Sequence, residues 1–164
     1  MKDTSADTAA KKRILATVVN KLKKKYGENV LLDPSGITHY DVISSGSMLF
    51  DKVSGIGGIA RGKVVEVYGD EASGKTTLAS CLCANAQERY PDDMVLFVDI
   101  EHALDLDYMR SFGVNTDPEK FILAQPSSIE EALTIMEDMC ESGLFSLIVL
   151  DSVGAALTED QLAK

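Results

Sequence analysis

Long apolar runs are missing from this sequence. No stretch approaches the roughly 20 apolar residues that a helix needs to cross a bilayer. The first residues, from Lys2 to Asp7, are polar and acidic, so they lack the apolar core of a secretory signal. These two absences predict a cytoplasmic protein with no membrane partner. The composition, 45% apolar and 26% charged over 164 residues, is typical of one soluble domain with a full hydrophobic core.

Cysteine and histidine are scarce. The three cysteines are Cys81, Cys83 and Cys140, and the two histidines are His39 and His102. Cys81 and Cys83 are two apart on a predicted helix and point to different faces, so buried free thiols are favoured over a C-x-C metal site. The histidines are too few and too scattered to complete a zinc site. The sequence therefore argues against a zinc protein.

Positive charge is lacking over most of the chain. The net charge is −10, but the first 26 residues hold eight Lys and Arg against two Asp and Glu, a net charge of +6. The remainder holds eight basic against twenty-four acidic residues, a net charge of −16. A general basic surface for nucleic acid is excluded, so any DNA site must be local or supplied from outside this chain.

The basic segment has the pattern of an amphipathic helix from Ala9 to Tyr26, which follows residues 1–8 that we expect to be disordered. Gly27 is a suitable C-cap. One face carries seven Lys and Arg, and the other carries Ile14, Leu15, Val18, Val19 and Leu22. Such a helix can bind a membrane surface, an acidic protein or nucleic acid, or simply expose a solvated basic face. Because the rest of the chain is acidic, we favour docking onto an acidic body, its own or that of a neighbouring subunit.

The stretch from Lys63 to Thr77 carries the motif around which the chain is organised. An apolar, β-rich run at Val64–Tyr68 predicts a strand, and a helical pattern follows the loop. The loop fits G-x-x-x-x-G-K-S/T, with the residues Gly69, Asp70, Glu71, Ala72, Ser73, Gly74, Lys75 and Thr76, followed by Thr77. The strand–loop–helix context favours a phosphate-binding P-loop over a turn that only joins two elements.

Each residue type in this loop has a physical role. Gly69 and Gly74 permit backbone angles closed to other residues, and the loop N–H groups form a nest for phosphate oxygens. The helix beginning near Gly74 adds unpaired N–H groups. Lys75 is predicted to reach the β- and γ-phosphates of ATP, and Thr76 to offer its hydroxyl to Mg²⁺. The two acidic residues fall at free positions of the motif and should face solvent.

Strands and helices alternate after the loop, which predicts an α/β fold with a largely parallel sheet flanked by helices and preceded by the N-terminal helix. We expect residues 1–32 to form an N-terminal tail and helix, and residues 33–164 to form the α/β core. The glycine-rich segment at residues 54–62 is expected to form turns. The expected strands are 94–100, 121–124 and 144–150, and one helix is expected at 105–112. A further helix is expected to carry an apolar stripe and to end at Gly143; the stripe consists of Ile129, Leu133, Met136 and Cys140.

Acidic residues follow two of these strands, where ligands bind parallel sheets. Asp151 ends an apolar strand and is predicted to support Mg²⁺, directly or through water; the alternative is that it caps the next turn. Glu101 follows another strand and is a candidate to activate water, against the alternative of a strand-end charge in solvent. Asp99 would point to the same face of this strand as Glu101 if the strand continued as far as Glu101. His102 is interpreted as a hydrogen-bonded structural residue without a catalytic role.

These segments together resemble the bacterial RecA recombinase family over roughly Asn20 to Thr158. The resemblance is carried by the P-loop, by the string Val98–Asp105, by Gln125-Pro126 and by Val149–Thr158, with further similarity at residues 43–47 and 57–62. The glutamate–histidine–alanine–leucine–aspartate string argues against other P-loop ATPases, such as circadian-type or helicase-loader proteins. The resemblance implies an ATP-dependent recombinase that forms helical filaments on single-stranded DNA and exchanges strands.

The resemblance also implies residue roles. Glu101 would be the catalytic carboxylate, and Asp105 and Tyr108 would contact the adenine. Lys75 and Thr76 would hold the phosphates and Mg²⁺, with Asp151 as the metal-supporting aspartate. The basic N-terminal helix would join subunits head to tail, on a second copy or on another RecA-like subunit.

The sequence departs from the family pattern in two ways. Asp70 stands where members commonly carry proline. Family members also continue past Lys164 with two DNA-binding loops, a glutamine that senses the γ-phosphate and a C-terminal domain. We therefore expect no contact with single-stranded DNA through residues present here, and weak or no ATP hydrolysis by this chain alone. The alternative is a non-catalytic module that caps, poisons or completes a filament.

Overall fold

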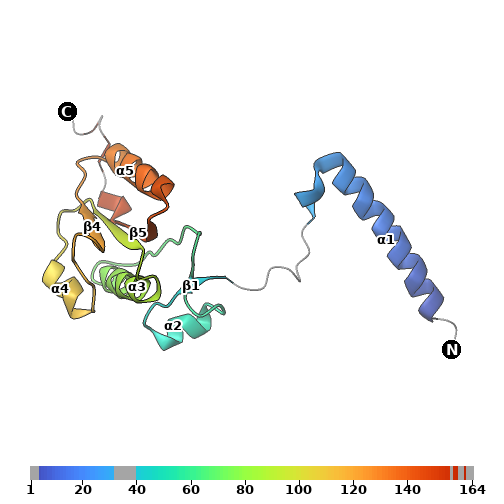
Figure 1. The fold of residues 1–164 in the computed structure, drawn as a ribbon, viewed down its shortest axis with the longest axis horizontal. Coiled ribbons are helices and arrows are strands. Elements are labelled where there is room, and N and C mark those ends of the chain that lie inside the picture. The colour runs from blue at the N-terminus through green and yellow to red at the C-terminus, as the bar shows by residue number, and fades with distance from the viewer. Residues whose placement is uncertain (1–3, 32–39, 156, 159–160, 162–164) are drawn as a thin grey trace. The chain divides into compact units, whose positions relative to one another are not determined.

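Figure 1 shows a computed structural model of the chain, which describes residues 4–31, 40–155, 157–158 and 161. The chain divides into two compact units, Met1–His39 and Tyr40–Lys164. The predicted domain boundary between residues 32 and 33 lies outside the described residues, so it stays a prediction.

The first unit contains the helix α1, Thr4–Tyr26, and the short 3₁₀ helix η1, Glu28–Val30. The expectation that residues 1–8 are disordered is wrong from Thr4 onward. Residues 4–10 include three alanines, the strongest helix former, and neither glycine nor proline. Gly27 ends the helix as predicted, with a φ of 98° and its N–H donating to the carbonyl of Lys23 at 2.8 Å. None of the helices in the described ranges is long and apolar enough to cross a membrane.

The apolar stripe of α1 is uncovered. Ile14 and Leu15 are 65% and 63% exposed, and Val18 is exposed as well. Val19 and Leu22 are half-buried. The helix thus presents an unpaired apolar face next to its lysines, as a docking helix would.

The second unit is built on a parallel three-stranded sheet with the order β4-β3-β5. The strands are β3 (Met94–Asp99), β4 (Phe121–Ala124) and β5 (Phe145–Asp151). Figure 1 shows α3 (Lys75–Arg89) and α5 (Ile129–Ser142) on either side of this sheet, with α4 (Leu106–Ser111) beside α3. The 3₁₀ helix η3, Val153–Ala155, follows β5. The predicted α/β class and largely parallel sheet are confirmed.

The core forms two layers because successive side chains of β3 point to opposite faces. Val95 and Phe97 pack in one buried cluster with Leu82, Cys83 and Ala86 of α3. The alternate residues of β3 pack in a second cluster that contains Ala132 of α5, together with the part-buried residues Ile129, Ile135, Met136 and Met139. Two residues of the apolar stripe predicted for α5, Leu133 and Cys140, are exposed and therefore do not belong to the face that packs on the sheet.

The three cysteines differ in burial. Cys83 is fully buried, and burial raises the pKa of its thiol to about 12. Cys81 is half-buried and Cys140 is exposed, because Cys140 lies outside the face of α5 that packs on the sheet. The buried-thiol interpretation, made for Cys81 and Cys83, therefore holds for Cys83 and only in part for Cys81. Among the described residues no group of three or more His, Cys, Asp or Glu is placed to hold a metal ion.

A small antiparallel sheet precedes the loop motif, formed by β1 (Val42–Ile43) and β2 (Ile59–Ala60), with the short helix α2 (Met48–Val53) between them. Arg61 fastens this part to the main sheet. Its guanidinium lies 4.2 Å from the centre of the Tyr90 ring and 2.6 Å from a carboxylate oxygen of Asp93, just before β3. Residues 54–62, which were predicted to form turns, thus contain a short strand as well as turns.

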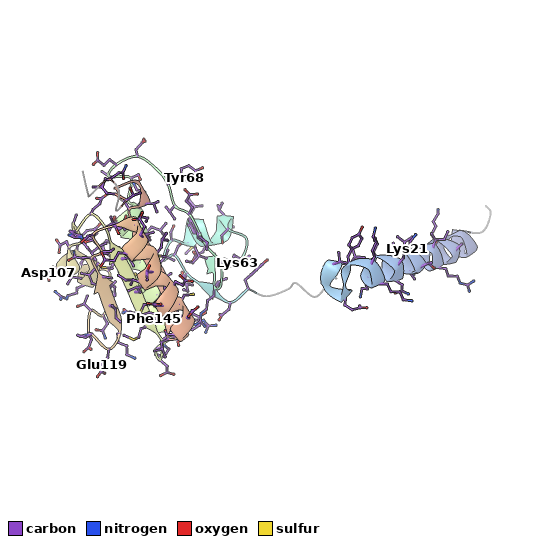
Figure 2. The ribbon with its side chains drawn as sticks, turned by 90° about the horizontal axis from the view of Figure 1, so that it is seen from above. Lys21, Lys63, Tyr68, Asp107, Glu119 and Phe145 are labelled. Atoms are coloured by element: carbon purple, nitrogen blue, oxygen red, sulfur yellow. The ribbon has the colours of Figure 1, made fainter. Side chains whose placement is uncertain are left out.

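The strand predicted at Val64–Tyr68 is not formed. These residues carry no strand assignment, Val64 is fully exposed and Tyr68 is 88% exposed. Figure 2 shows Lys63 and Tyr68 at the periphery of the second unit. The composition of the run was interpreted correctly as β-forming, but a strand also needs a neighbour to accept its backbone hydrogen bonds. Within the described residues no segment pairs with it.

Candidate functional site

The loop Gly69–Thr76 leads directly into α3. Gly74 has a φ of 92° and is the N-cap of the helix, so its left-handed conformation is the one predicted for a glycine. The prediction is wrong for Gly69, which does not have a positive φ. A Cβ at Gly69 would lie 2.9 Å from Oγ of Ser73, a side chain that can rotate away. Ala72 takes up the remaining strain with a φ of 58°.

Lys75 lies folded back over this loop. Its Nζ donates to the carbonyl oxygens of Gly69 at 3.0 Å and Asp70 at 2.9 Å. The side chains of Asp70 and Glu71 are exposed, as predicted. The amine is thus held at the loop by neutral carbonyls, which anionic oxygens can replace with stronger, charge-assisted bonds.

Thr76 and Asp151 are brought together although they are 75 residues apart. Oγ1 of Thr76 donates to Oδ2 of Asp151 at 2.8 Å, which joins the first turn of α3 to the end of β5. The other carboxylate oxygen accepts from Oγ of Ser152 at 3.2 Å. Among the described residues the carboxylate of Asp151 thus bonds to the hydroxyls of Thr76 and Ser152 and to no backbone N–H, which disfavours the alternative that it only caps the following turn.

Glu101 follows β3 at the same edge of the sheet. Asp99 is the register partner of Asp151, and the N–H of Ile100 donates to the carbonyl of Asp151 at 2.9 Å. Glu101 comes next and is exposed. Across the described part of the chain its carboxylate has no hydrogen-bond or ion-pair partner. The structure thus leaves this carboxylate accessible to solvent, two residues after the strand that pairs with the end of β5.

Asp99 has a different place from the one expected. The strand ends at Asp99, and this residue is buried instead of sharing an exposed face with Glu101. Its carboxylate accepts from the N–H groups of Ala103 at 3.4 Å and Leu104 at 3.0 Å, and from Nε2 of Gln125 at 3.0 Å. Asp99 therefore holds the loop after Glu101. A carboxylate inside an apolar run was the signal that sequence reasoning left unused.

Asp105 and Tyr108 lie on α4 next to the loop. Oδ1 of Asp105 accepts from the N–H groups of Asp107 at 2.9 Å and Tyr108 at 3.1 Å, so Asp105 is the N-cap of a helix that was predicted to include it. The hydroxyl of Tyr108 lies 2.8 Å from Oγ1 of Thr77. The ring of Tyr108 is therefore placed directly beside the phosphate-binding motif.

His102 has the structural role predicted for it. Its φ is 55°, and its Nε2 lies 3.2 Å from the carbonyl oxygen of Pro126. This contact links the loop after β3 to the loop after β4.

The side chains at the site fit Mg²⁺ bound together with phosphates. Magnesium prefers oxygen ligands, keeps several waters and is commonly held by one or two carboxylates plus substrate phosphates. Thr76 and Asp151 supply one hydroxyl and one carboxylate within hydrogen-bond distance of each other.

A glycine-rich loop at the start of a helix, ending in lysine and threonine and facing an aspartate on a parallel strand, defines the P-loop class of α/β proteins. The chain belongs to one family within that class: the model of the RecA N-terminal domain family matches residues 13–163. The resemblance based on sequence motifs is thereby confirmed.

Curated relatives agree with this membership. The chain is 43% identical over 155 residues to "Protein RecA" of Mesoplasma florum, an overlap of 93% of this chain and 45% of the relative. It is 42% identical over 161 residues to "Protein RecA" of Deinococcus radiodurans, covering 96% of this chain and 43% of the relative. The chain thus spans less than half the length of these curated relatives.

Proposed function

We propose that this chain is the ATP-binding part of a RecA-like DNA recombination and repair protein, and that it binds ATP with Mg²⁺ at the loop Gly69–Thr76. The observation that carries this proposal is the hydrogen bond between Thr76 and Asp151. It unites the two residues that a P-loop protein uses to support magnesium, from elements far apart in the sequence.

The residues of the loop bind and orient the phosphates. The N–H groups at the start of α3 point along the helix axis toward an anion. The amine of Lys75 exchanges its two carbonyl partners for β- and γ-phosphate oxygens. Thr76 and Asp151 would hold Mg²⁺, which would offset the negative charge of the phosphates.

Glu101 and Tyr108 take the remaining roles. The accessible carboxylate of Glu101 orients a water and accepts its proton. The ring of Tyr108, fixed by its contact with Thr77 and by the edge of Phe112 at 4.9 Å, packs on the adenine together with Asp105. Both roles follow from family membership and are supported by the positions of these side chains around the loop.

Calorimetric titration with ATP and Mg²⁺ tests this proposal, comparing the chain with Lys75→Ala. Loss of a charge-assisted hydrogen bond should weaken ATP binding by about 10- to 100-fold. Lys63→Ala is the matched control, because Lys63 is an exposed lysine just before the loop. Equal affinity of Lys75→Ala and the unmodified chain, or no binding by either, would contradict the proposal.

The names of the relatives support the recombination role. In the role that we propose, the protein self-assembles through α1. Single-stranded DNA is bound by parts outside these residues. Turnover of ATP by this chain alone should then be weak and unchanged by single-stranded DNA. Hydrolysis that rises when single-stranded DNA is added would contradict this assignment of the DNA site.

A second candidate is a non-catalytic module that binds a RecA-like filament. The exposed apolar stripe of α1 favours it, because such a stripe can dock on another subunit without any turnover of ATP. Co-sedimentation with the full-length relative from Deinococcus radiodurans tests this candidate. No association at micromolar concentrations would exclude the module.

A further inference from the structure

Asp99 is a buried carboxylate to which the proposed function gives no role. It is 3% exposed and stands at the last position of the central strand β3. Burying a carboxylate is costly unless hydrogen-bond donors surround it. Among the described residues three donors do so: the N–H groups of Ala103 and Leu104, and Nε2 of Gln125. Because bonds to a charged acceptor are stronger than neutral ones, Asp99 is a firm anchor for the residues that donate to it.

The segment that Asp99 anchors is residues 100–105, which we call the 100–105 loop. It contains neither helix nor strand, and its residues 101–103 are exposed. An irregular, exposed segment has few contacts to fix its backbone, so the hydrogen bonds that it does make decide its position. Asp99 accepts two of these bonds from the loop, and its bond from Gln125 ties the same carboxylate to the residue that follows β4.

The end of the 100–105 loop sets the place of an aromatic ring at the proposed nucleotide site. Asp105 is the N-cap of α4, and its Oδ1 accepts from the N–H of Tyr108 at 3.1 Å. This helix has only six residues, too few to be stable alone, so its position depends on its start and on the packing of Met109 in the core. The hydroxyl of Tyr108 lies 2.8 Å from Oγ1 of Thr77. A shift of the loop therefore moves this ring relative to α3.

We propose that Asp99, together with Gln125, is a positioning residue for the nucleoside part of ATP: by holding the 100–105 loop it sets Asp105 and Tyr108 against the adenine. This step rests on the ATP site proposed above. The phosphates are bound by a separate loop, Gly69–Thr76, to which the side chain of Asp99 makes no hydrogen bond among the described residues. Asp99 should thus matter for binding of the nucleoside and not for binding of the phosphates.

The alternative is that Asp99 only stabilises the fold. Its replacement would then lower the free energy of unfolding and leave the relative affinity of the folded chain for two ligands of the same site unchanged. Inorganic tripolyphosphate carries the phosphates of ATP without its nucleoside. The ratio of the affinity for ATP to the affinity for tripolyphosphate therefore separates a positioning role from a structural one.

Calorimetric titration of the chain with each ligand in the presence of Mg²⁺ tests the proposal. Asn has the shape of Asp, but it is neutral and replaces one acceptor oxygen by an amide donor. Asp99→Asn should therefore weaken ATP binding by about tenfold and change tripolyphosphate binding by less than about twofold. Asp138→Asn is the control, because it makes the same change at an exposed position of α5, and it should leave both affinities unchanged.

Exchange of the two partners tests the proposal even where Asp99→Asn does not fold, which circular dichroism detects. Gln125→Glu places a second carboxylate against Asp99, and Gln125 is exposed, so the core stays intact. Like charges repel, so this variant should also lose affinity for ATP alone. The double variant Asp99→Asn with Gln125→Glu restores the hydrogen bond with donor and acceptor exchanged, and it should recover part of the lost affinity.

The outcomes distinguish failure of this proposal from failure of the ATP site. Tripolyphosphate and ATP affinities that fall together in Asp99→Asn would overturn the positioning role. ATP binding by Gln125→Glu equal to that of the unmodified chain, or a double variant that recovers nothing, would overturn it as well. No binding of either ligand by the unmodified chain would overturn the ATP site, and this proposal with it.

Discussion

Gly58 is the residue whose replacement should disturb the fold most directly. It has a φ of 152°, and a Cβ there would lie 2.2 Å from the carbonyl oxygen of Ile43, which is backbone and cannot rotate away. We predict that Gly58→Ala lowers the free energy of unfolding by about 3 kcal/mol or more. Urea denaturation followed by circular dichroism measures this loss.

Gly57→Ala is the matched control for that substitution. Gly57 also has a positive φ, of 89°, but a Cβ there meets nothing within 4 Å. Gly57→Ala should lower the free energy of unfolding only by the backbone strain at this position, about 1 kcal/mol. Equal losses for the two variants would show that the contact between Gly58 and Ile43 does not limit stability.

Among single residues, sequence reasoning found those whose chemistry follows from a fixed spacing. Lys75 and Thr76 were identified by the loop motif, and Asp151 by its place at the end of an apolar strand; the structure brings Thr76 and Asp151 into contact. The hydrogen-bonding role of Asp99 was missed. Its partners Ala103 and Leu104 lie in the loop that directly follows, whereas Gln125, 26 residues away, is placed by tertiary structure; a carboxylate inside an apolar run was the signal left unused.

At the scale of elements, Asp51 secures the short helix α2. Its carboxylate accepts from the hydroxyls of Ser44 and Ser45, both at 2.6 Å, and from the N–H of Ser45 at 2.9 Å. These hydrogen bonds, the Ser44 hydroxyl foremost, hold the pKa of Asp51 below its usual 3.8. Because the pKa is lowered on folding, this contribution to stability is present above pH 3.8 and is lost as the pH falls below it.

We predict that Asp51→Asn destabilises the fold by about 1 kcal/mol at pH 7, because a neutral amide offers fewer and weaker acceptors. The difference from the unmodified chain should shrink as the pH is lowered through 3.8. Urea unfolding at pH 7 and pH 3 measures the difference in free energy of unfolding at each pH. Asp92→Asn is the control, because Asp92 is exposed. A difference that is the same at both pH values would contradict the role of the charged carboxylate.

Element types were largely predictable, whereas element neighbours were not. The strands at 94–99, 121–124 and 145–151 formed within a residue or two of expectation, because their apolar runs are bounded by turn residues. Val64–Tyr68 has an equally clear pattern and formed no strand. The difference is the presence of a pairing partner, which is a property of the sheet and not of the segment. The face of α5 was similarly misjudged, since Leu133 and Cys140 satisfy the helical period but lie beside the packed face.

At the scale of the whole molecule, the uneven charge gives a prediction for self-association through α1. A positive segment with an exposed apolar stripe can dock on the acidic second unit of another copy. We predict that Ile14→Glu combined with Val18→Glu weakens self-association by about tenfold or more, and that added salt weakens it in the unmodified chain. Sedimentation velocity over a range of protein and salt concentrations measures both effects.

Leu133→Glu is the control for this experiment, because it adds the same charge at an exposed leucine of α5. It should leave self-association unchanged. Equal weakening by Leu133→Glu and the double variant would indicate a general charge effect, which would remove the case for docking through α1.

The contact between Thr76 and Asp151 also bears on the order in which the chain matures. During synthesis the glycine-rich loop emerges first, and Asp151 follows 75 residues later. The pair then forms only when β5 has aligned with β3 in the correct register, since a slip of one residue would turn Asp151 to the opposite face. A ligand that needs both residues therefore binds finished molecules and bypasses partly folded ones. By mass action such a ligand stabilises the finished state over partly folded chains.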